Sequence, residues 1–267
     1  MKKKNLEYII SKIFDDLDRS VINVSKGFTA DDIHDFRLQV KELRALLRML
    51  SIDPVCSKKF KVPRRIKYIY TVSGRLRDLQ ICRGIIKYYF TSSQFPENFL
   101  KLLKREKDKY TREFKKAIDN KRFSNSAKKL HHKIHGILRP GIASYFYDRK
   151  IGNIRYMLSR NGIDDEGFHH IRKNIKDIQY INKLATNYTD YDVFFGKCKI
   201  FSTAEQLAYE LGQINDLCTV LAFLKPSRLN KIPDQEKTRL YRLRQQCFSN
   251  KESLKAAVFK KLIELDL

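Results

Sequence analysis

Five basic side chains recur at helical spacing in the first part of the chain. They are His34, Arg37, Lys41, Arg44 and Arg48, each three or four residues after the previous one, and we call them the first basic stripe. On an α-helix this spacing places them along one face, where like charges repel at a cost of about 0.2–0.5 kcal/mol per pair. A ligand with closely spaced negative charges would offset that repulsion, and guanidinium and ammonium groups hold phosphate oxygens well. The stripe therefore predicts an anion site.

An apolar stripe runs beside the basic one on the same predicted helix. It consists of Ile33, Phe36, Val40, Leu43, Leu47 and Leu50. Apolar residues at this period form the face that packs into a core. We therefore expect the first basic stripe at the rim or floor of a groove between packed helices. The alternatives are that the stripe is solvated surface and that the histidines only hold the start of a helix in the core.

The same construction returns in the second half of the chain. His169, Arg172 and Lys176 repeat the offsets of three and then four residues, with Lys183 further on, and we call these four the second basic stripe. Its apolar neighbours are Phe168, Ile171, Ile175 and Ile178. A fixed arrangement that occurs twice in one chain predicts two related helical units.

A second motif follows each basic stripe. It is Gly74-Arg-Leu-Arg77-Asp78 in the first half and Gly212-Gln-Ile-Asn215-Asp216 in the second. A glycine inside a helix costs roughly 1 kcal/mol relative to alanine, so both glycines predict the close approach of another helix. We expect the two aspartates to orient nearby arginines by charge-assisted hydrogen bonds.

Composition restricts the class of protein. The 267 residues include 55 Lys+Arg and 30 Asp+Glu, which gives a formal net charge of +25 and makes a polyanion the expected partner. No apolar run approaches the roughly 18 residues that a membrane span needs. The five cysteines are far apart and form no C-x-x-C motif, which favours reduced thiols in a cytoplasmic protein.

Helical periodicity is present almost throughout, so the predicted fold class is all-α. Gly, Pro and capping residues divide the chain into about ten helices. We expect them at about 5–24, 30–53, 63–90, from 96 onward, from Ser124 or Ser126 to Pro140, and at 143–160, 167–186, 201–224, 234–249 and 251–265.

The linked motifs resemble those of the CHAD domain, the conserved histidine α-helical domain, over nearly the whole chain. They are His-x-x-Arg-x-x-x-Lys-x-x-Arg with Gly-x-x-Arg-Asp, and His-x-x-Arg-Lys-x-x-Lys with Tyr180 behind it and Leu-Gly-x-x-Asn-Asp. The resemblance implies two four-helix-bundle-like halves related by a pseudo-twofold axis. It also implies a basic central cavity that binds inorganic polyphosphate. We expect a single domain over 1–267, with halves of about 1–140 and 141–267.

The resemblance assigns ligand residues by position. The polyphosphate-binding set, extended by Arg48 of the first basic stripe, is His34, Arg37, Lys41, Arg44, Arg48, Lys67, Arg77, His169, Arg172, Lys173 and Lys176. Tyr68, Tyr70 and Tyr180 are candidates to hydrogen-bond phosphate oxygens. The second half departs from the family pattern at Gln179 and is less basic at its later helix, so we expect it to bind more weakly. Glu42 also stands where the family usually has a basic residue.

The sequence favours a binding protein over an enzyme. It has no Gly-rich phosphate loop, H-E-x-x-H, G-x-S-x-G or E-x-E-x-K motif. We expect no cofactor and no metal, because the pair His131 and His135 has no acidic or cysteine partner nearby.

The competing hypothesis is non-specific nucleic-acid binding. The segment from Lys101 to Arg139, with 14 Lys+Arg and 4 Asp+Glu, is a candidate secondary surface for nucleic acid or an acidic protein. The expected location is the cytoplasm, with polyphosphate granules as one site of association.

Overall fold

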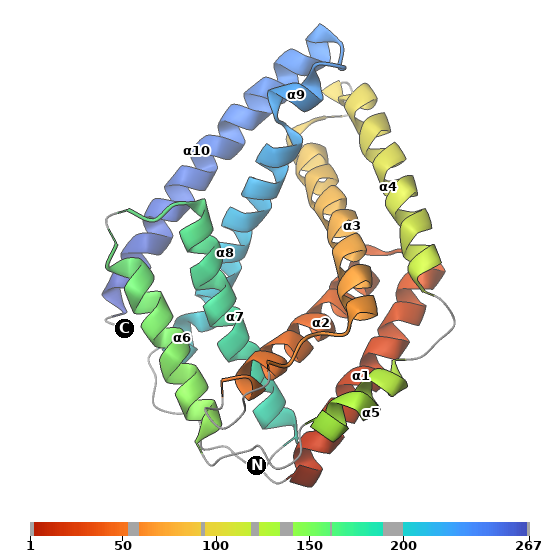
Figure 1. Cartoon of the computed structure of the whole chain (residues 1–267). Coiled ribbons are helices and arrows are strands. Elements are labelled where there is room, and N and C mark those ends of the chain that lie inside the picture. Colours follow the sequence, from red (N-terminus) through yellow and green to blue (C-terminus); the bar gives the residue numbers. More distant parts are fainter. Residues whose placement is uncertain are drawn as a thin grey trace.

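The computed structural model describes residues 3–52, 59–91, 94–118, 123–133, 141–160, 162–188 and 200–265. Every regular element in these ranges is helical, so the all-α prediction is confirmed (Figure 1). The elements are α1 (Lys3–Gly27), α2 (Ala30–Leu50), α3 (Arg64–Tyr89), α4 (Glu97–Ala117), α5 (Ser124–Lys133), α6 (Ile142–Leu158), α7 (Asp165–Tyr188), α8 (Ile200–Phe223), α9 (Pro226–Leu229) and α10 (Asp234–Glu264).

The helix that carries the first basic stripe starts at a side-chain cap. Thr29 Oγ1 accepts a hydrogen bond from the backbone N–H of Asp32 at 3.1 Å, which satisfies one of the free donors at the start of α2. The carboxylates of Asp31 and Asp32 lie in the same first turn, where negative charge suits the helix dipole. These contacts fix where α2 begins, about one turn before His34.

Four inner helices, α2, α3, α7 and α8, form a ring with the outer helices around it (Figure 1). In the first half α1 packs on α2 and α4 packs on α3, and in the second half α6 packs on α7 and α10 packs on α8. Contacts of α2 with α7 and of α3 with α8 join the halves. Both basic stripes therefore lie on inner helices that touch each other.

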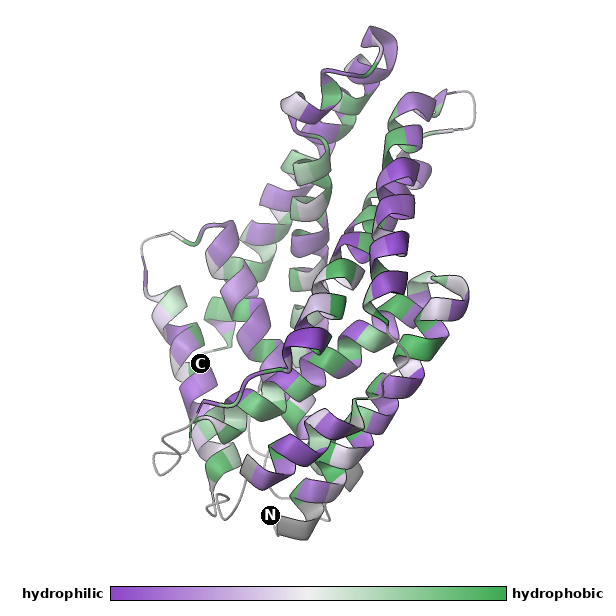
Figure 2. Ribbon diagram, turned by 45° about the vertical axis from the view of Figure 1, so that its right-hand side comes forward, coloured by the Kyte–Doolittle hydropathy of each residue, from purple (hydrophilic) through white to green (hydrophobic). Residues whose placement is uncertain are grey.

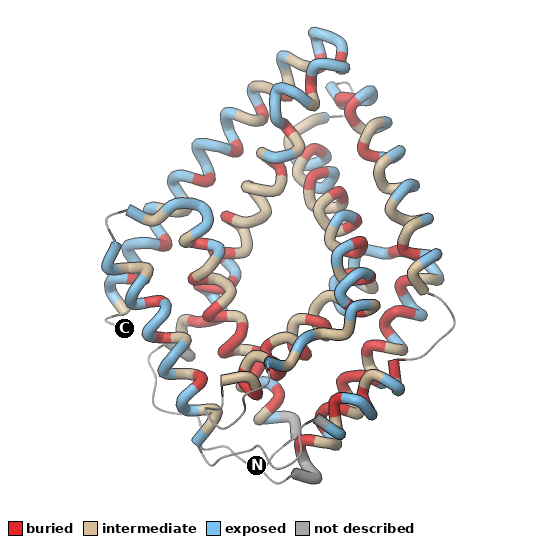
Figure 3. Tube along the Cα trace, in the orientation of Figure 1, coloured by how far each residue is buried: buried red, intermediate tan, exposed pale blue. Residues whose placement is uncertain are grey.

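The apolar stripes are buried as predicted. All six residues of the first and all four of the second are at most 3% exposed. Figure 2 shows hydrophobic segments alternating with hydrophilic ones along the helices, and Figure 3 shows buried positions recurring at the same period. The core has three clusters, of which the third combines the ends of α3 and α8 with α4, α9 and α10. This third cluster is a connection between the halves that the sequence did not indicate.

The C-terminal region differs from the prediction. Two helices were expected, with a break near Ser249 and Asn250, but α10 is one continuous helix, and the short α9 was not expected. Lys251 occupies a buried position on the packing face of α10 together with Cys247 and Val258. A lysine at that position interrupts the apolar pattern, and its ion pairs satisfy the charge there.

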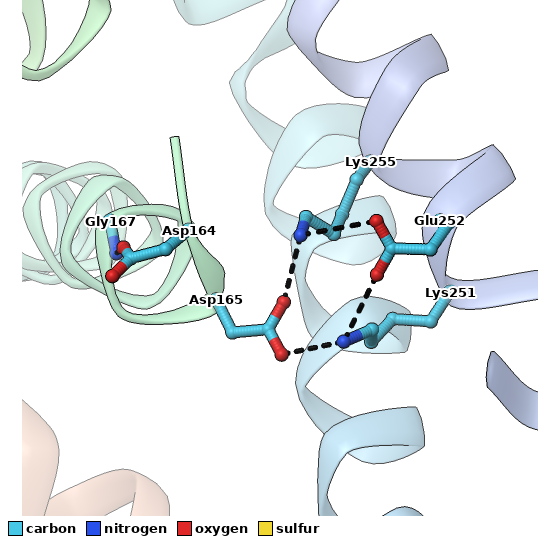
Figure 4. A network of polar contacts seen from close by, with 6 residues as sticks. All are labelled: Asp164, Asp165, Gly167, Lys251, Glu252 and Lys255. Carbon is cyan, nitrogen blue, oxygen red and sulfur yellow. Dashed lines mark hydrogen bonds and ion pairs between the residues drawn. The ribbon is translucent and has the colours of Figure 1, made fainter. Parts of the chain in front are cut away.

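Those ion pairs connect α10 to the start of α7 (Figure 4). Lys251 Nζ lies 2.6 Å and Lys255 Nζ 2.9 Å from the two carboxylate oxygens of Asp165. Burial opposes ionisation of Asp165, but the hydrogen bonds from the two lysines outweigh it and lower the pKa of this carboxyl. Glu252 completes the network by contacting both lysines. The network holds the first turn of α7, one turn before His169.

Several predictions concern residues that lie outside the described ranges. The expected end of a helix at Pro140, His135 of the histidine pair, Cys56 and Cys198 all lie there. Cys82, Cys218 and Cys247 are free thiols. In the described part of the chain, no helix combines the length and the apolar character that crossing a bilayer requires.

Candidate anion-binding site

A pocket of about 220 Å³ opens between α2, α3 and α7. Its walls are Lys41, Arg44 and Arg48 of α2, Tyr70 of α3, and His169, Arg172, Lys173, Lys176, Asp177 and Tyr180 of α7. Seven of these are basic residues of the predicted polyphosphate-binding set, and the two tyrosines were also predicted to face the ligand. Asp177 was not predicted.

The pocket brings the two basic stripes face to face. Lys41 of the first stripe is close enough to Arg172 and Lys176 of the second for their charges to disfavour its own. Arg37 on the same helix and Arg77 on α3 act in the same direction. Burial is the largest cause, and together these effects lower the pKa of Lys41 from 10.5 to about 7. Asp216 of α8 offsets part of this charge, because Lys41 and Arg172 lie near its carboxyl.

The other lysines of the pocket are perturbed in the same direction. Burial lowers the pKa of Lys176, and Arg172 adds to the shift. Burial also lowers the pKa of Lys173, with Arg48 and Arg44 contributing from α2. The walls of the pocket thus disfavour further positive charge, which is the electrostatic condition that an anion would relieve.

Arg172 carries the clearest unsatisfied donor. Its Nε is buried and has no hydrogen-bond partner among the described residues. Its guanidinium lies against Gly212 of α8, 3.9 Å from where a β-carbon would stand. A buried N–H without a partner costs about 1–3 kcal/mol, so an acceptor bound at this point would be stabilising.

Arg48 is held differently from the other cations. Its Nη1 donates to both carboxylate oxygens of Asp177 at 2.7 and 2.8 Å. Lys150 of α6 donates to the same carboxylate at 2.6 Å. Asp177 therefore neutralises part of one wall and joins α2, α6 and α7. The signal in the sequence was an acid four residues after Lys173, on a helix face that otherwise gathers basic residues.

Two acids of the inner helices, Glu42 and Glu210, form ion pairs with lysines of other helices. Lys183 of the second basic stripe donates to Glu42 of α2 at 2.7 Å, away from the pocket lining. Glu210 of α8 is bound by Lys261 and Gln206. These acids connect helices to one another and do not line the pocket.

Arg37 lies next to the pocket and not in its lining. Its Nη1 donates to the backbone oxygen of Tyr70 at 2.9 Å, and its guanidinium carbon stands 4.4 Å from the centre of the Tyr70 ring. The absent side chain of Gly74 leaves room for this group. The predicted close approach is thus made at Gly74 by an arginine of the neighbouring helix. At Gly212 the nearest atoms, those of Arg172, lie at ordinary van der Waals distance, so the prediction is not confirmed there.

The remaining predicted residues lie outside the pocket lining. Lys67 and Tyr68 are exposed. His34 is exposed but close to Arg77 and Lys41, and partial burial followed by these two charges lowers its pKa. His169, the corresponding histidine of the second half, does line the pocket. Burial lowers its pKa and the charges of Lys173 and Arg172 add to that shift, whereas a hydrogen bond with Asn215 raises the pKa.

Asp78 and Asp216 face each other from α3 and α8. Burial raises the pKa of both carboxyls, and each arginine nearby opposes the shift. The largest opposing charge is Arg37 at Asp78 and Arg172 at Asp216. This proximity is what an orienting role requires, and the role itself stays a prediction.

The comparisons with known proteins show the family and the fold. A family model described as the CHAD domain matches residues 8–225. The chain belongs to the CHAD domain family. Among solved structures, this CHAD domain is similar to the one described as the crystal structure of the CHAD domain from the plant Ricinus communis, with a TM-score of 0.73 and 14% identity. The match covers 97% of this chain and 91% of the plant chain, and at that identity it concerns the fold alone. No curated protein matches this CHAD domain.

Proposed function

We propose that this CHAD domain binds inorganic polyphosphate, without hydrolysing it, in the pocket between α2, α3 and α7. The family as a whole is associated with polyphosphate binding. The observation that carries the proposal is the meeting of the two basic stripes, in which Lys41, Arg172 and Lys176 share a confined space. Their mutual repulsion is a cost in the free protein that a polyanion removes.

The contacts available in the pocket suit phosphate. Arginine forks and lysine ammonium groups bind phosphate oxygens through short, charge-assisted hydrogen bonds. Arg172, whose buried Nε has no partner among the described residues, is one of the arginines that line the pocket. Because many modest contacts act together along a chain and counterions are released, long-chain polyphosphate should bind far more tightly than orthophosphate.

The one carboxylate in the lining supports binding and not catalysis. Asp177 is engaged by Arg48 and Lys150, so it is not free to act as a general base. The proposal therefore gives no residue of the pocket a catalytic role, and it requires no metal, because the cations of the walls neutralise the phosphates. We expect a protein that binds polyphosphate in this way to lie in the cytoplasm and to associate with polyphosphate granules.

Nucleic acid is the second candidate ligand, and a different surface favours it. The outer face of α4 exposes Lys101, Lys104, Arg105, Lys109, Arg112, Lys115 and Lys116. Such a face attracts the phosphate backbone of DNA or RNA without sequence preference. Polyphosphate is therefore expected in the pocket, and nucleic acid on the outer face of α4.

A competition assay separates the two candidates. Labelled long-chain polyphosphate is bound to the full chain at physiological salt, and unlabelled polyphosphate, orthophosphate and duplex DNA compete. Lys41→Gln with Arg172→Gln removes two charges from the pocket, and Lys104→Gln with Lys115→Gln removes two from α4. We expect the pocket variant to lose at least about tenfold in polyphosphate affinity and the α4 variant about twofold. Equal displacement by DNA, or the reverse order of the variants, would contradict the proposal.

A further inference from the structure

The amine of Lys41 has unusual surroundings for a lysine. It lines the pocket and is accessible from it, although most of the side chain is buried. Charged and titratable groups face it from every neighbouring inner helix. They are His34 and Arg37 of α2, Arg77 of α3, Arg172 and Lys176 of α7, and Asp216 of α8.

These neighbours favour the neutral amine. Four of them are cations, and both burial and like charge oppose an ammonium group at this position. Asp216, the acid named among these neighbours, is itself pushed toward its neutral form by burial. The resulting pKa of about 7 leaves a large fraction of Lys41 with a free lone pair at neutral pH. An exposed lysine has almost none under the same conditions.

The same cations would hold an anion beside that lone pair. Arg172 and Lys176 line the pocket together with Lys41, so a small phosphate ester bound to them brings its other end close to the amine. A nucleophile and an anchor for the phosphate group within one pocket raise the effective concentration of a phosphorylated electrophile.

We propose that Lys41 is a nucleophilic amine that forms an imine with small phosphorylated aldehydes held in the pocket. The Nζ lone pair attacks the aldehyde carbon, and the carbonyl oxygen becomes a hydroxyl by taking up a proton as the nitrogen loses one. The carbinolamine then loses one molecule of water and leaves a C=N bond. This inference deepens the proposed function, because both require the pocket to hold a phosphate group.

Lys41 is distinguished from the other two lysines of the pocket by its neighbours. At Lys173 the charges of Glu166 and Asp177 oppose the loss of the proton, and at Lys176 that of Glu205 does. At Lys41 all the leading influences act in one direction. We therefore expect the reaction to be selective within the pocket as well as against surface lysines.

The test uses pyridoxal 5′-phosphate as the aldehyde and the full chain as the protein. After incubation at pH 7 the imine is reduced with borohydride, and the modified peptides are identified by mass spectrometry. We expect Lys41 to react roughly a hundredfold faster than the exposed Lys104, because far more of it is unprotonated. At low aldehyde concentration, where the free protein determines the pH profile, the rate at Lys41 should rise with pH with a midpoint near 7. Lys41→Arg keeps the positive charge and should remove this adduct while leaving labelling of Lys104 unchanged.

Two controls accompany the test, which are pyridoxal as a second aldehyde and the exposed lysines as a second target. Pyridoxal, which lacks the phosphate, should label Lys41 at least about tenfold more slowly because it has no group for Arg172 and Lys176 to hold. Equal labelling by pyridoxal, or labelling spread evenly over exposed lysines, would overturn the inference. These measurements on the unmodified sequence suffice even if Lys41→Arg does not fold.

Polyphosphate distinguishes this inference from the proposed function. If both are right, long-chain polyphosphate binds and protects Lys41 from the aldehyde. Rapid labelling of Lys41 with no polyphosphate binding would defeat the proposed function and leave the nucleophile standing. Tight polyphosphate binding with an unreactive Lys41 would defeat this inference alone.

Discussion

The guanidinium of Arg37 occupies space that a side chain on residue 74 would need. Its Nη1 stands 2.8 Å from the ideal β-carbon position at Gly74, closer than side-chain contacts normally come. The same guanidinium donates to the backbone oxygen of Tyr70 and stacks on its ring. Glycine at position 74, which costs helix propensity, therefore leaves the space in which Arg37 packs between α2 and α3 beside the pocket.

Gly74→Ala should gain less stability than alanine at other helical glycines. Gly84 on the same helix has open space around it, so Gly84→Ala should raise the free energy of unfolding by about 0.5–1 kcal/mol. At Gly74 the displaced Arg37 offsets that gain. Denaturant unfolding of the two variants measures the difference, and an equal gain at both positions would show that Arg37 moves at no cost.

Neighbouring residues of α2 should separate site from scaffold. Lys41→Gln with Arg44→Gln should reduce polyphosphate affinity strongly and leave the free energy of unfolding unchanged or higher, because repulsion is removed. Arg37 is left in place because it packs on Tyr70. Leu43→Ala, at a fully buried position, should instead cost about 2–5 kcal/mol of stability. Thermal unfolding and polyphosphate titration test both. A double variant that unfolds, or binds as well as the parent, would refute the site assignment.

Polyphosphate affinity should fall as pH rises from 6 to 8. A bound polyanion favours the charged form of Lys41, whose pKa in the free protein is about 7, so binding takes up a proton and is favoured by acid. The lowered pKa values of His34 and His169 act with the same sign. Titrations across this range, with Lys41→Gln as the comparison, should give a steeper slope for the parent. A pH-independent affinity would contradict the model, as would affinity that increases with pH.

Asp177→Asn should change affinity and stability in opposite directions. The variant removes the anion that holds Arg48 and Lys150, so two cations become available and polyphosphate should bind several-fold more tightly. The free energy of unfolding should fall by about 1–3 kcal/mol, because the cations lose a buried partner. Excess polyphosphate should restore part of that stability. Weaker polyphosphate binding by this variant would show that Asp177 positions the walls and does not merely neutralise them.

Glu236 connects the far ends of the two halves. This buried carboxylate of α10 accepts hydrogen bonds from the backbone N–H groups of Asn98 and Phe99 and from the Asn98 amide, at the start of α4. Glu236→Ala should lower the free energy of unfolding by about 1–3 kcal/mol, since it removes a helix cap and leaves donors unpaired. Gln235→Ala, at the exposed neighbouring position, should have little effect. Similar losses in both variants would show that the hydrogen bonds of Glu236 to the start of α4 are not responsible.

Local sequence patterns were enough to predict most of the helices and both basic stripes. Apolar spacing predicted the buried faces of α2 and α7 residue by residue, and Thr29 and Pro63 indicated where helices start. These predictions succeed because the 3.6-residue period places side chains on a face before any packing occurs. The same period put Lys41 and Arg44 on one face of α2, and Arg172 and Lys176 on one face of α7.

Tertiary structure decided which of those faces meet. That Lys41 lies opposite Arg172, that Asp177 neutralises Arg48, and that Lys183 finds Glu42 all depend on how α2 and α7 pack. It also decided that the buried Lys251 of α10 is paired, because its partner Asp165 belongs to a helix more than eighty residues away in sequence. A stripe is fixed by the geometry of a single helix. The charge that opposes or pairs with it belongs to another helix, whose position follows from burial of the whole core and is not encoded in local spacing.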